Sequence, residues 1–337
     1  MAGSAKVKVG LALGGGAARG WAHIGVLNSL EKAGIRPDII AGTSIGAVVG
    51  GCYSAGHLEH LERWASDLTP KRVFGYLDFN LAGNGLISGQ RLCDRLEQHL
   101  GDRNIEDLPT RFTAVATEIG TGHEHWLSRG RLVDAVRASY ALPGLFKPVK
   151  VNGRWLFDGA LVNPIPVSVC RALGARYVIA VNLNFDILGR GSVISMPQAV
   201  DVETDDPEFL AEEETKQEKK GVRALLYRQI FGRGDGAPGI STVMVDAFNI
   251  VQDRIARSRL AGDPPDAMIS PRLQDIGLFD FHRAAEAIER GRVAVDRQLD
   301  DLLSEISTRD SRRPQGQLER ARAQAGTLVD AIQPVAK

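Results

Sequence analysis

The sequence is poor in cysteine, and its three cysteines do not form the pattern of a disulfide framework. Cys52, Cys93 and Cys170 are odd in number, widely spaced and outside any C-x-x-C motif. Small domains that depend on disulfides usually carry an even number of cysteines. We therefore expect reduced thiols and a cytoplasmic protein.

An excess of charge of one sign and a long hydrophobic run are also absent. Forty-one basic residues balance 41 acidic ones, which argues against a nucleic-acid partner held through its phosphates. No window approaches the ~18 uninterrupted apolar residues of a membrane-spanning helix. The apolar run 9–13 ends in three glycines, unlike a signal peptide. Peripheral contact with a membrane stays open as an alternative.

Short apolar runs alternate with amphipathic segments along most of the chain. The runs predict strands at 7–13, 38–41, 112–117, 124–127, 177–183 and 266–269, and a hairpin over 149–157 that turns at Asn152-Gly153. Helical periodicity predicts helices at about 18–32, 58–68, 90–99, 131–139, 243–260 and 281–302. Strands interleaved with helices indicate an α/β fold, a three-layer α/β/α sandwich around a mostly parallel sheet.

Composition divides the chain into four parts. Residues 1–185 are expected to form the first part of the core, and 243–302 the remainder. Residues 186–242 are expected to form a polar insertion, in which an acidic stretch precedes a basic amphipathic segment at 216–233. That segment suits a lid over a site, contact with an anionic membrane, or an ordinary surface helix. Residues 303–337 are expected to form a polar, mobile tail.

The pentapeptide 42–46, with the sequence G-T-S-I-G, follows the apolar run 39–41. A G-x-S-x-G between a strand and a helix is typical of a nucleophile elbow, in which the small residues Gly42 and Gly46 flank a turn that exposes the hydroxyl of Ser44. The following helix directs its N-terminus at the same point. A glycine-rich turn with an inert serine is the alternative.

A second glycine-rich loop, residues 14–20, also lies between a predicted strand and a predicted helix. It lacks the lysine of a P-loop, because Trp21 stands at that position, and it lacks the third glycine of a dinucleotide fingerprint. The backbone N–H groups of such a loop beside a nucleophile elbow suit an oxyanion hole. A loop kept thin only for packing is the alternative.

A serine that transfers acyl groups needs a base, and a histidine base is hard to find here. None of the seven histidines occupies the late strand–loop position of a Ser-His-Asp triad. His57-x-x-His60 and His123-x-His125 lack a third ligand, so we interpret them as surface residues and expect no metal or other cofactor. Asp158, in the tripeptide Asp-Gly-Ala after the hairpin, is the carboxylate left as a partner.

The three motifs 14–20, 42–46 and 158–160, in this order, resemble those of patatin-like phospholipases, and most closely the bacterial branch related to neuropathy target esterase. The resemblance covers about 7–185 and 243–300. It implies a Ser–Asp dyad, with Ser44 as nucleophile and Asp158 as base. It also implies an oxyanion hole from the backbone of Gly14, Gly15 and Gly16, with Arg19 nearby. Ala160 departs from the family pattern, which often has glycine there.

The resemblance implies hydrolysis of an acyl ester of a phospholipid, a lysophospholipid or a simpler molecule. Acyl transfer to another acceptor would use the same residues, and a lipid-binding or regulatory protein could keep the same fold. A free aspartate has a pKa near ~3.9 and is a weak base toward a hydroxyl. We therefore expect Asp158 to be buried, which would raise its pKa. The oligomeric state is left open.

Overall fold

A computed structural model of the chain describes residues 6–76, 90–143, 145–186 and 240–311. The expected insertion at 186–242 lies mostly outside these ranges, and its basic segment at 216–233 lies wholly outside them. The part of the expected tail beyond residue 311 lies outside them as well. Helix α10 begins at Ile240, slightly before the predicted end of the insertion.

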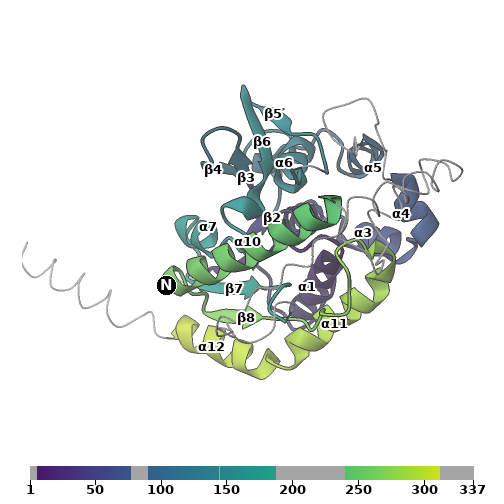
Figure 1. Cartoon of the computed structure of the whole chain (residues 1–337). Helices are drawn as coiled ribbons and strands as arrows, with labels where there is room; N and C mark the ends of the chain where they lie inside the picture. The colour runs from purple at the N-terminus through teal and green to yellow at the C-terminus, as the bar shows by residue number, and fades with distance from the viewer. Residues whose placement is uncertain (1–5, 77–89, 144, 187–239, 312–337) are drawn as a thin grey trace, which may run out of the picture.

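The described strands form a single mixed sheet (Figure 1). Its order is β5-β6-β3-β2-β1-β7-β8, and β4 pairs with β3 beside this path. The five strands from β3 to β8 in this order are parallel, whereas β4, β5 and β6 are antiparallel to their neighbours. The strands are β1 (Val9–Leu13), β2 (Ile39–Thr43), β3 (Arg111–Glu118), β4 (Glu124–Leu127), β5 (Val149–Val151), β6 (Arg154–Asp158), β7 (Tyr177–Val181) and β8 (Ala267–Ile269). The predicted α/β fold with a mostly parallel sheet is confirmed.

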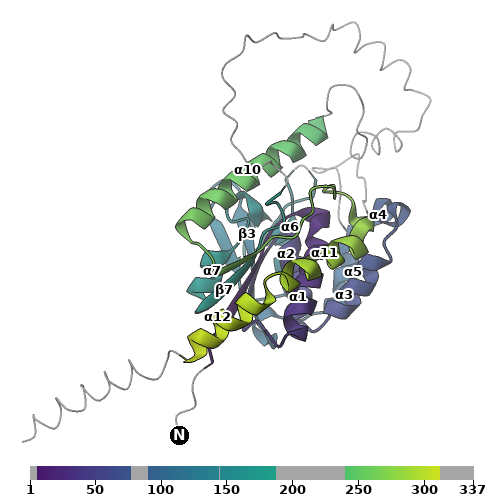
Figure 2. The ribbon, with the colours of Figure 1, turned by 90° about the horizontal axis from the view of Figure 1, so that it is seen from below.

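Helices cover both faces of the sheet (Figure 2). Helices α7 and α10 lie on one face, and α1, α2, α6 and α11 lie on the other, with α3, α4 and α5 beside them. The helices are α1 (Ala22–Lys32), α2 (Ile45–Ser54), α3 (Leu58–Ser66), α4 (Pro70–Tyr76), α5 (Gln90–Leu100), α6 (Leu132–Tyr140), α7 (Val167–Ala172), α10 (Ile240–Gly262), α11 (Ala284–Asp296) and α12 (Leu299–Ser311). Strands β1, β2 and β7 are buried along their whole length, as expected for parallel strands covered on both sides. No helix in the described part of the chain is long and apolar enough to cross a membrane.

Helices α1 and α11, which are far apart in the sequence, pack with their backbones almost in contact. A Cβ atom on Gly25 would lie 1.8 Å from the carbonyl oxygen of Ile288, and one on Gly291 would lie 2.0 Å from that of Ala22. Only glycine fits at such a distance. Helix α11 is therefore a packed part of the same core as α1.

The single helix predicted over 281–302 is wrong. The chain forms a short 3-10 turn at Phe281–Arg283, then α11, then a break at 297–298, and then α12. The break lets α12 leave α1 and reach the edge of the sheet, where Glu305 accepts a hydrogen bond of 2.8 Å from the hydroxyl of Tyr177. Residues 303–311, expected in the tail, are thus helical and contact the core.

Candidate active site

Two strands that run toward each other along β3 bring Ser44 and Asp158 together. Thr43, the last residue of β2, pairs with Val115, and Asp158, the last residue of β6, pairs with the next residue, Ala116. Because β4 pairs with residues 114–117 of β3, β2 and β6 must share the opposite edge. Ser44 directly follows β2, so the register places its side chain beside the carboxylate.

Ser44 has a backbone conformation that L-residues seldom adopt. Its φ is +56° and its ψ is −125°, at the turn between β2 and α2. Its N–H donates a hydrogen bond of 3.0 Å to the hydroxyl oxygen of Ser139, which in turn donates one of 2.6 Å to the carbonyl oxygen of Val115. The buried Ser139 of α6 therefore ties the strained turn to the sheet.

The glycines on either side of Ser44 are required by close packing of the backbone. A Cβ atom on Gly46 would lie 2.2 Å from the carbonyl oxygen of Leu13, and one on Gly42 would lie 2.5 Å from that of Gly46. The first contact joins α2 to the end of β1, where the glycine-rich loop begins. The G-x-S-x-G pattern thus corresponds to a turn too tight for larger residues.

The Ser44 hydroxyl donates a hydrogen bond of 2.6 Å to Oδ2 of Asp158. The other carboxylate oxygen, Oδ1, accepts a hydrogen bond of 2.8 Å from the N–H of Ala160. Asp158 is only 1% exposed, and burial raises its pKa to about 7, although the hydrogen bonds from Ser44 and Ala160 act in the opposite direction. A carboxylate of this kind accepts a proton near neutral pH far better than an exposed aspartate does.

No histidine takes part in this arrangement. All seven histidines lie within the described ranges, and none hydrogen-bonds Ser44. His23 is fully buried and its ring contacts the carbonyl oxygen of Gly14 at 2.8 Å. Burial lowers the pKa of His23 to about 4, so the ring is neutral and donates from Nε2. His23 therefore holds the carbonyl group of Gly14 at the start of the glycine-rich loop.

Two of the loop glycines use their N–H groups for structure. The N–H of Gly14 donates to the carbonyl oxygen of Val181 at 3.2 Å, and that of Gly15 donates to Pro164 at 3.0 Å. The N–H groups of Gly16 and Ala17 have no acceptor among the described residues, and both residues line the same pocket as Ser44. Of the three glycines expected to supply donors, Gly16 therefore keeps an available N–H group, and Ala17, which was not expected, supplies a second.

Arg19, expected near the oxyanion hole, is directed elsewhere. Its side chain is 6% exposed, and its Nε donates a hydrogen bond of 2.8 Å to the carbonyl oxygen of Ile276. Nη1 donates a further bond of 3.3 Å to Asn184. Arg19 thus joins the glycine-rich loop to the segment that precedes α11, and it does not line the pocket at Ser44.

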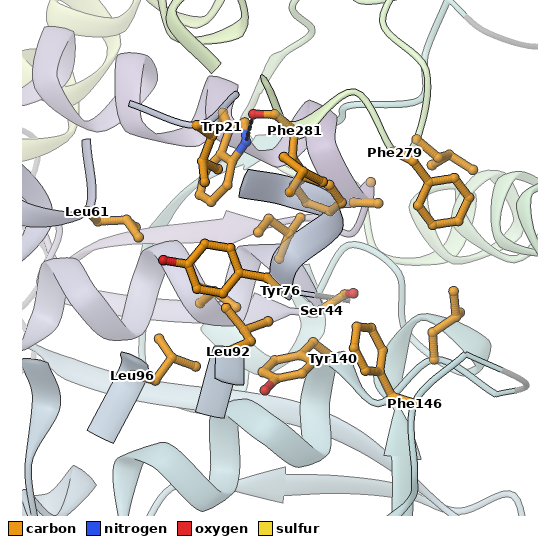
Figure 3. Close-up of a pocket in the computed structure, with 18 of the residues that line it drawn as sticks. Trp21, Ser44, Leu61, Tyr76, Leu92, Leu96, Tyr140, Phe146, Phe279 and Phe281 are labelled. Atoms are coloured by element: carbon orange, nitrogen blue, oxygen red, sulfur yellow. Dashed lines mark hydrogen bonds between the residues drawn. The ribbon is translucent and has the colours of Figure 1, made fainter. Parts of the chain in front are cut away.

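Ser44 and Asp158 open into an apolar pocket of about 170 Å³ (Figure 3). One wall follows a face of α2 from Ser44 through Val48 to Cys52, a distance of about 12 Å at the rise of an α-helix. Aromatic and aliphatic side chains form most of the rest. They come from α3, α4, α5, the turn before α1, the end of α6 and the loop after it, and the segment before α11, and include Trp21, Leu61, Trp64, Tyr76, Leu92, Leu96, Tyr140, Phe146, Phe279 and Phe281. The pocket fits a hydrocarbon chain attached to a group at Ser44.

The chain is similar to proteins of known families. The family description Patatin-like phospholipase matches residues 11–171, a range that includes Ser44 and Asp158. An NTE family protein of Mycobacterium tuberculosis is 33% identical over 334 residues, which cover 88% of this chain and 93% of that protein.

Two relatives are much longer proteins. A lysophospholipase of Emericella nidulans is 35% identical over 190 residues, which cover 52% of this chain but 12% of that protein. The human patatin-like phospholipase domain-containing protein 6 is 35% identical over 182 residues, which cover 52% of this chain and 13% of that protein. In these two, the similarity is confined to one part of a larger chain.

Proposed function

Because this chain belongs to the patatin-like phospholipases, within their NTE family, we propose that it is a serine hydrolase that cleaves acyl esters of lipids. The observation that carries the proposal is the 2.6 Å hydrogen bond from the Ser44 hydroxyl to the buried carboxylate of Asp158. The pair lies at an apolar pocket suited to the acyl chain. The names of the fungal and human relatives support a phospholipid or lysophospholipid as substrate.

In the first half of the reaction, Oγ of Ser44 attacks the carbonyl carbon of the ester while its proton passes to Oδ2 of Asp158. The carbonyl oxygen becomes an oxyanion, which the N–H groups of Gly16 and Ala17 stabilise. The ester bond then breaks, and Asp158 returns the proton to the departing alcohol. The acyl group is left on Ser44.

In the second half, a water molecule takes the place of the alcohol. Asp158 accepts a proton from this water as its oxygen attacks the acyl carbon, and the same two N–H groups hold the second oxyanion. Collapse releases the carboxylic acid and returns the proton to Ser44. One carboxylate therefore serves as base and acid in turn, and the hydrogen bond from Ala160 keeps it oriented.

The test measures hydrolysis of p-nitrophenyl esters and of lysophosphatidylcholine by the wild type, Ser44→Ala and Asp158→Asn. Each substitution should lower kcat by at least about a thousandfold, since each removes one half of the reacting pair. A fluorophosphonate probe should label the wild type and leave Ser44→Ala unlabelled. Substantial hydrolysis by Asp158→Asn would contradict the assignment of the base.

Acyl transfer and simple lipid binding are separated by the products. Hydrolysis of a mixed phospholipid substrate should release free fatty acid, which mass spectrometry detects. If the acyl group appears instead on an added alcohol at the expense of free acid, the protein is a transferase. If lipid binds but neither product forms, the proposed chemistry is wrong.

A further inference from the structure

One end of the apolar pocket is lined by basic side chains. His57, which directly precedes α3, and His60 of α3 line it together with Arg95 and His99 of α5. The rings of His57 and His60 have their centres 5.6 Å apart, and those of His60 and His99 are 6.2 Å apart. The sequence suggests a surface position for His57 and His60, but the fold gathers them with α5 at one end of a pocket.

A second hollow, of about 480 Å³, adjoins this end of the pocket and is called the basic hollow here. Its lining residues come from α3, α4, α5 and the turn between α3 and α4: His60, Arg63, Trp64, Asp67, Leu68, Arg72, Tyr76, Arg95 and His99. Three guanidinium groups and two imidazoles thus face one carboxylate. Helices α3, α4 and α5 lie together at one end of the molecule (Figures 1 and 2).

Contacts with other described residues engage only a few of the donors of the basic hollow. Arg63 approaches Glu59 at 3.7 Å on the exposed face of α3. Nη1 of Arg72 donates to the backbone carbonyl of Asp67 at 3.0 Å. Nη1 of Arg95 donates to the amide oxygen of Gln98 at 3.3 Å, a neutral acceptor. The basic groups are therefore only partly neutralised.

Two of the nitrogen atoms here are buried without a partner. Nε of Arg95 and Nε2 of His99 have no hydrogen-bond acceptor among the described residues. The pKa of His99 is lowered, first by burial and then by the charges of Arg95 and His60. A buried donor without an acceptor is costly, and an anion bound here would satisfy both groups. A metal ion is not suited to this site, because the described residues contain no metal-binding group of His, Cys, Asp and Glu.

We propose that the basic hollow binds a phosphate group, at a site separate from Ser44 and Asp158. Arginine presents a planar fork of donors that matches phosphate oxygens, and three arginines around one hollow supply more donors than a single carboxylate would use. Neither Ser44 nor Asp158 lines the basic hollow. A phosphate bound there would therefore lie outside the reacting centre.

The bound phosphate group can belong to free inorganic phosphate or to the headgroup of a lipid. Calorimetric titration of the full chain with inorganic phosphate measures the first. Co-sedimentation with phosphatidylcholine vesicles, with and without phosphatidic acid, measures the second. Each is performed on the wild type, on Arg63→Gln/Arg72→Gln and on Arg95→Gln. The control, Arg36→Gln/Arg111→Gln, removes two exposed arginines outside the basic hollow.

The two variants of the basic hollow should weaken binding at least about tenfold, because a hydrogen bond to a charged group contributes more than a factor of ten in affinity. The control variant should bind as the wild type does. Phosphate binding that depends on these arginines supports a site for free phosphate. Binding seen only with phosphatidic acid supports a headgroup site. If neither ligand binds, or if the control loses as much affinity as the variants do, the proposal is wrong.

Ser44→Ala separates this proposal from the proposed function. It should abolish ester hydrolysis and leave binding of phosphate or phosphatidic acid unchanged. An active esterase without binding would overturn the anion site alone, whereas binding by an inactive wild type would overturn the esterase alone.

Discussion

The pKa of Asp158 determines the pH range in which Ser44 can be activated. The carboxyl must be ionised to accept the serine proton, and burial raises its pKa to about 7. We predict that kcat/KM rises about tenfold per pH unit below this pKa and levels off above it. A pH–rate profile on a neutral p-nitrophenyl ester measures this directly. A profile that levels off at pH 5 would show that burial does not raise the pKa of this carboxyl to about 7.

The same shift predicts how stability depends on pH. In the folded protein Asp158 keeps its proton up to a pH of about 7, whereas in the unfolded chain it loses the proton near its ordinary pKa of 3.8. The native state thus binds more protons between these values, and its stability falls as pH rises through them.

Asp158→Asn removes this dependence. Between pH 5 and pH 8 the wild type should lose on the order of 2 kcal/mol of unfolding free energy through Asp158, and the variant should lack this loss. Urea denaturation of both proteins at the two pH values measures the difference. If the unfolding free energy of both proteins changes equally between these pH values, burial does not raise the pKa of Asp158.

Ser139 is the residue whose removal should affect the reaction without affecting binding. Its hydroxyl accepts from the N–H of Ser44 and donates to Val115, so Ser139→Ala releases the strained turn. We predict a loss of kcat of at least about tenfold, a KM within about twofold of the wild type, and a stability loss of about 1–3 kcal/mol. Steady-state kinetics and urea denaturation provide these values. An unchanged kcat would mean that the turn holds its shape without Ser139.

At the scale of the element, helix α2 can begin directly after Ser44 only because Gly46 lies against the end of β1. Gly46→Ala would place a Cβ atom 2.2 Å from the backbone oxygen of Leu13, and neither backbone can move freely. We predict a loss of more than about 3 kcal/mol, or failure to fold. Gly75→Ala in α4 is the matched control, because no atom of the described residues lies within 4 Å of its added Cβ. Thermal denaturation should show a large loss for the first and little change for the second.

The elements that the sequence predicts well are those with a strong local signal. Strand β4 and the hairpin at Asn152-Gly153 follow from alternation and turn chemistry. The break between α11 and α12 has no such signal, because Arg297-Gln298 contains neither glycine nor proline. It arises from the different surfaces on which the two helices pack. The sequence shows no helical signal for α7, because this helix is short and follows two prolines.

The residues of the candidate site also differ in whether the sequence alone reveals them. Ser44 and Asp158 stand in recognisable motifs, and the structure places them within hydrogen-bonding distance. Ser139 stands in no pattern that reveals its role, since that role depends on a contact between α6 and the turn after β2. The same holds for Ala17 and for the histidines at the end of the pocket. Which loop N–H groups remain available depends on Val181 and Pro164, which are far away in the sequence.

At the scale of the whole molecule, Asp266 joins three elements at the edge of the sheet opposite the hairpin. Its side chain, 10% exposed, forms ion pairs with Arg171 of α7 at 2.8 Å and with Arg309 of α12 at 2.7 Å. It also accepts a hydrogen bond of 2.7 Å from the N–H of Val178 in β7. This carboxylate is therefore one of the contacts that attach α12 to the core, together with the hydrogen bond from Tyr177 to Glu305.

Asp266→Ala should lower the unfolding free energy by about 2 kcal/mol. Removing one partner of a buried ion pair costs more than this, but both arginines are more than a third exposed and water compensates part of the loss. Asp263→Ala is the matched control, because Asp263 is an exposed aspartate three positions earlier and should change stability by less than about 0.5 kcal/mol. Urea denaturation gives both values. If α12 is held mainly through this carboxylate, Arg309→Ala should cost clearly less in the Asp266→Ala background than in the wild type; full additivity would show that the helix is held by its other contacts.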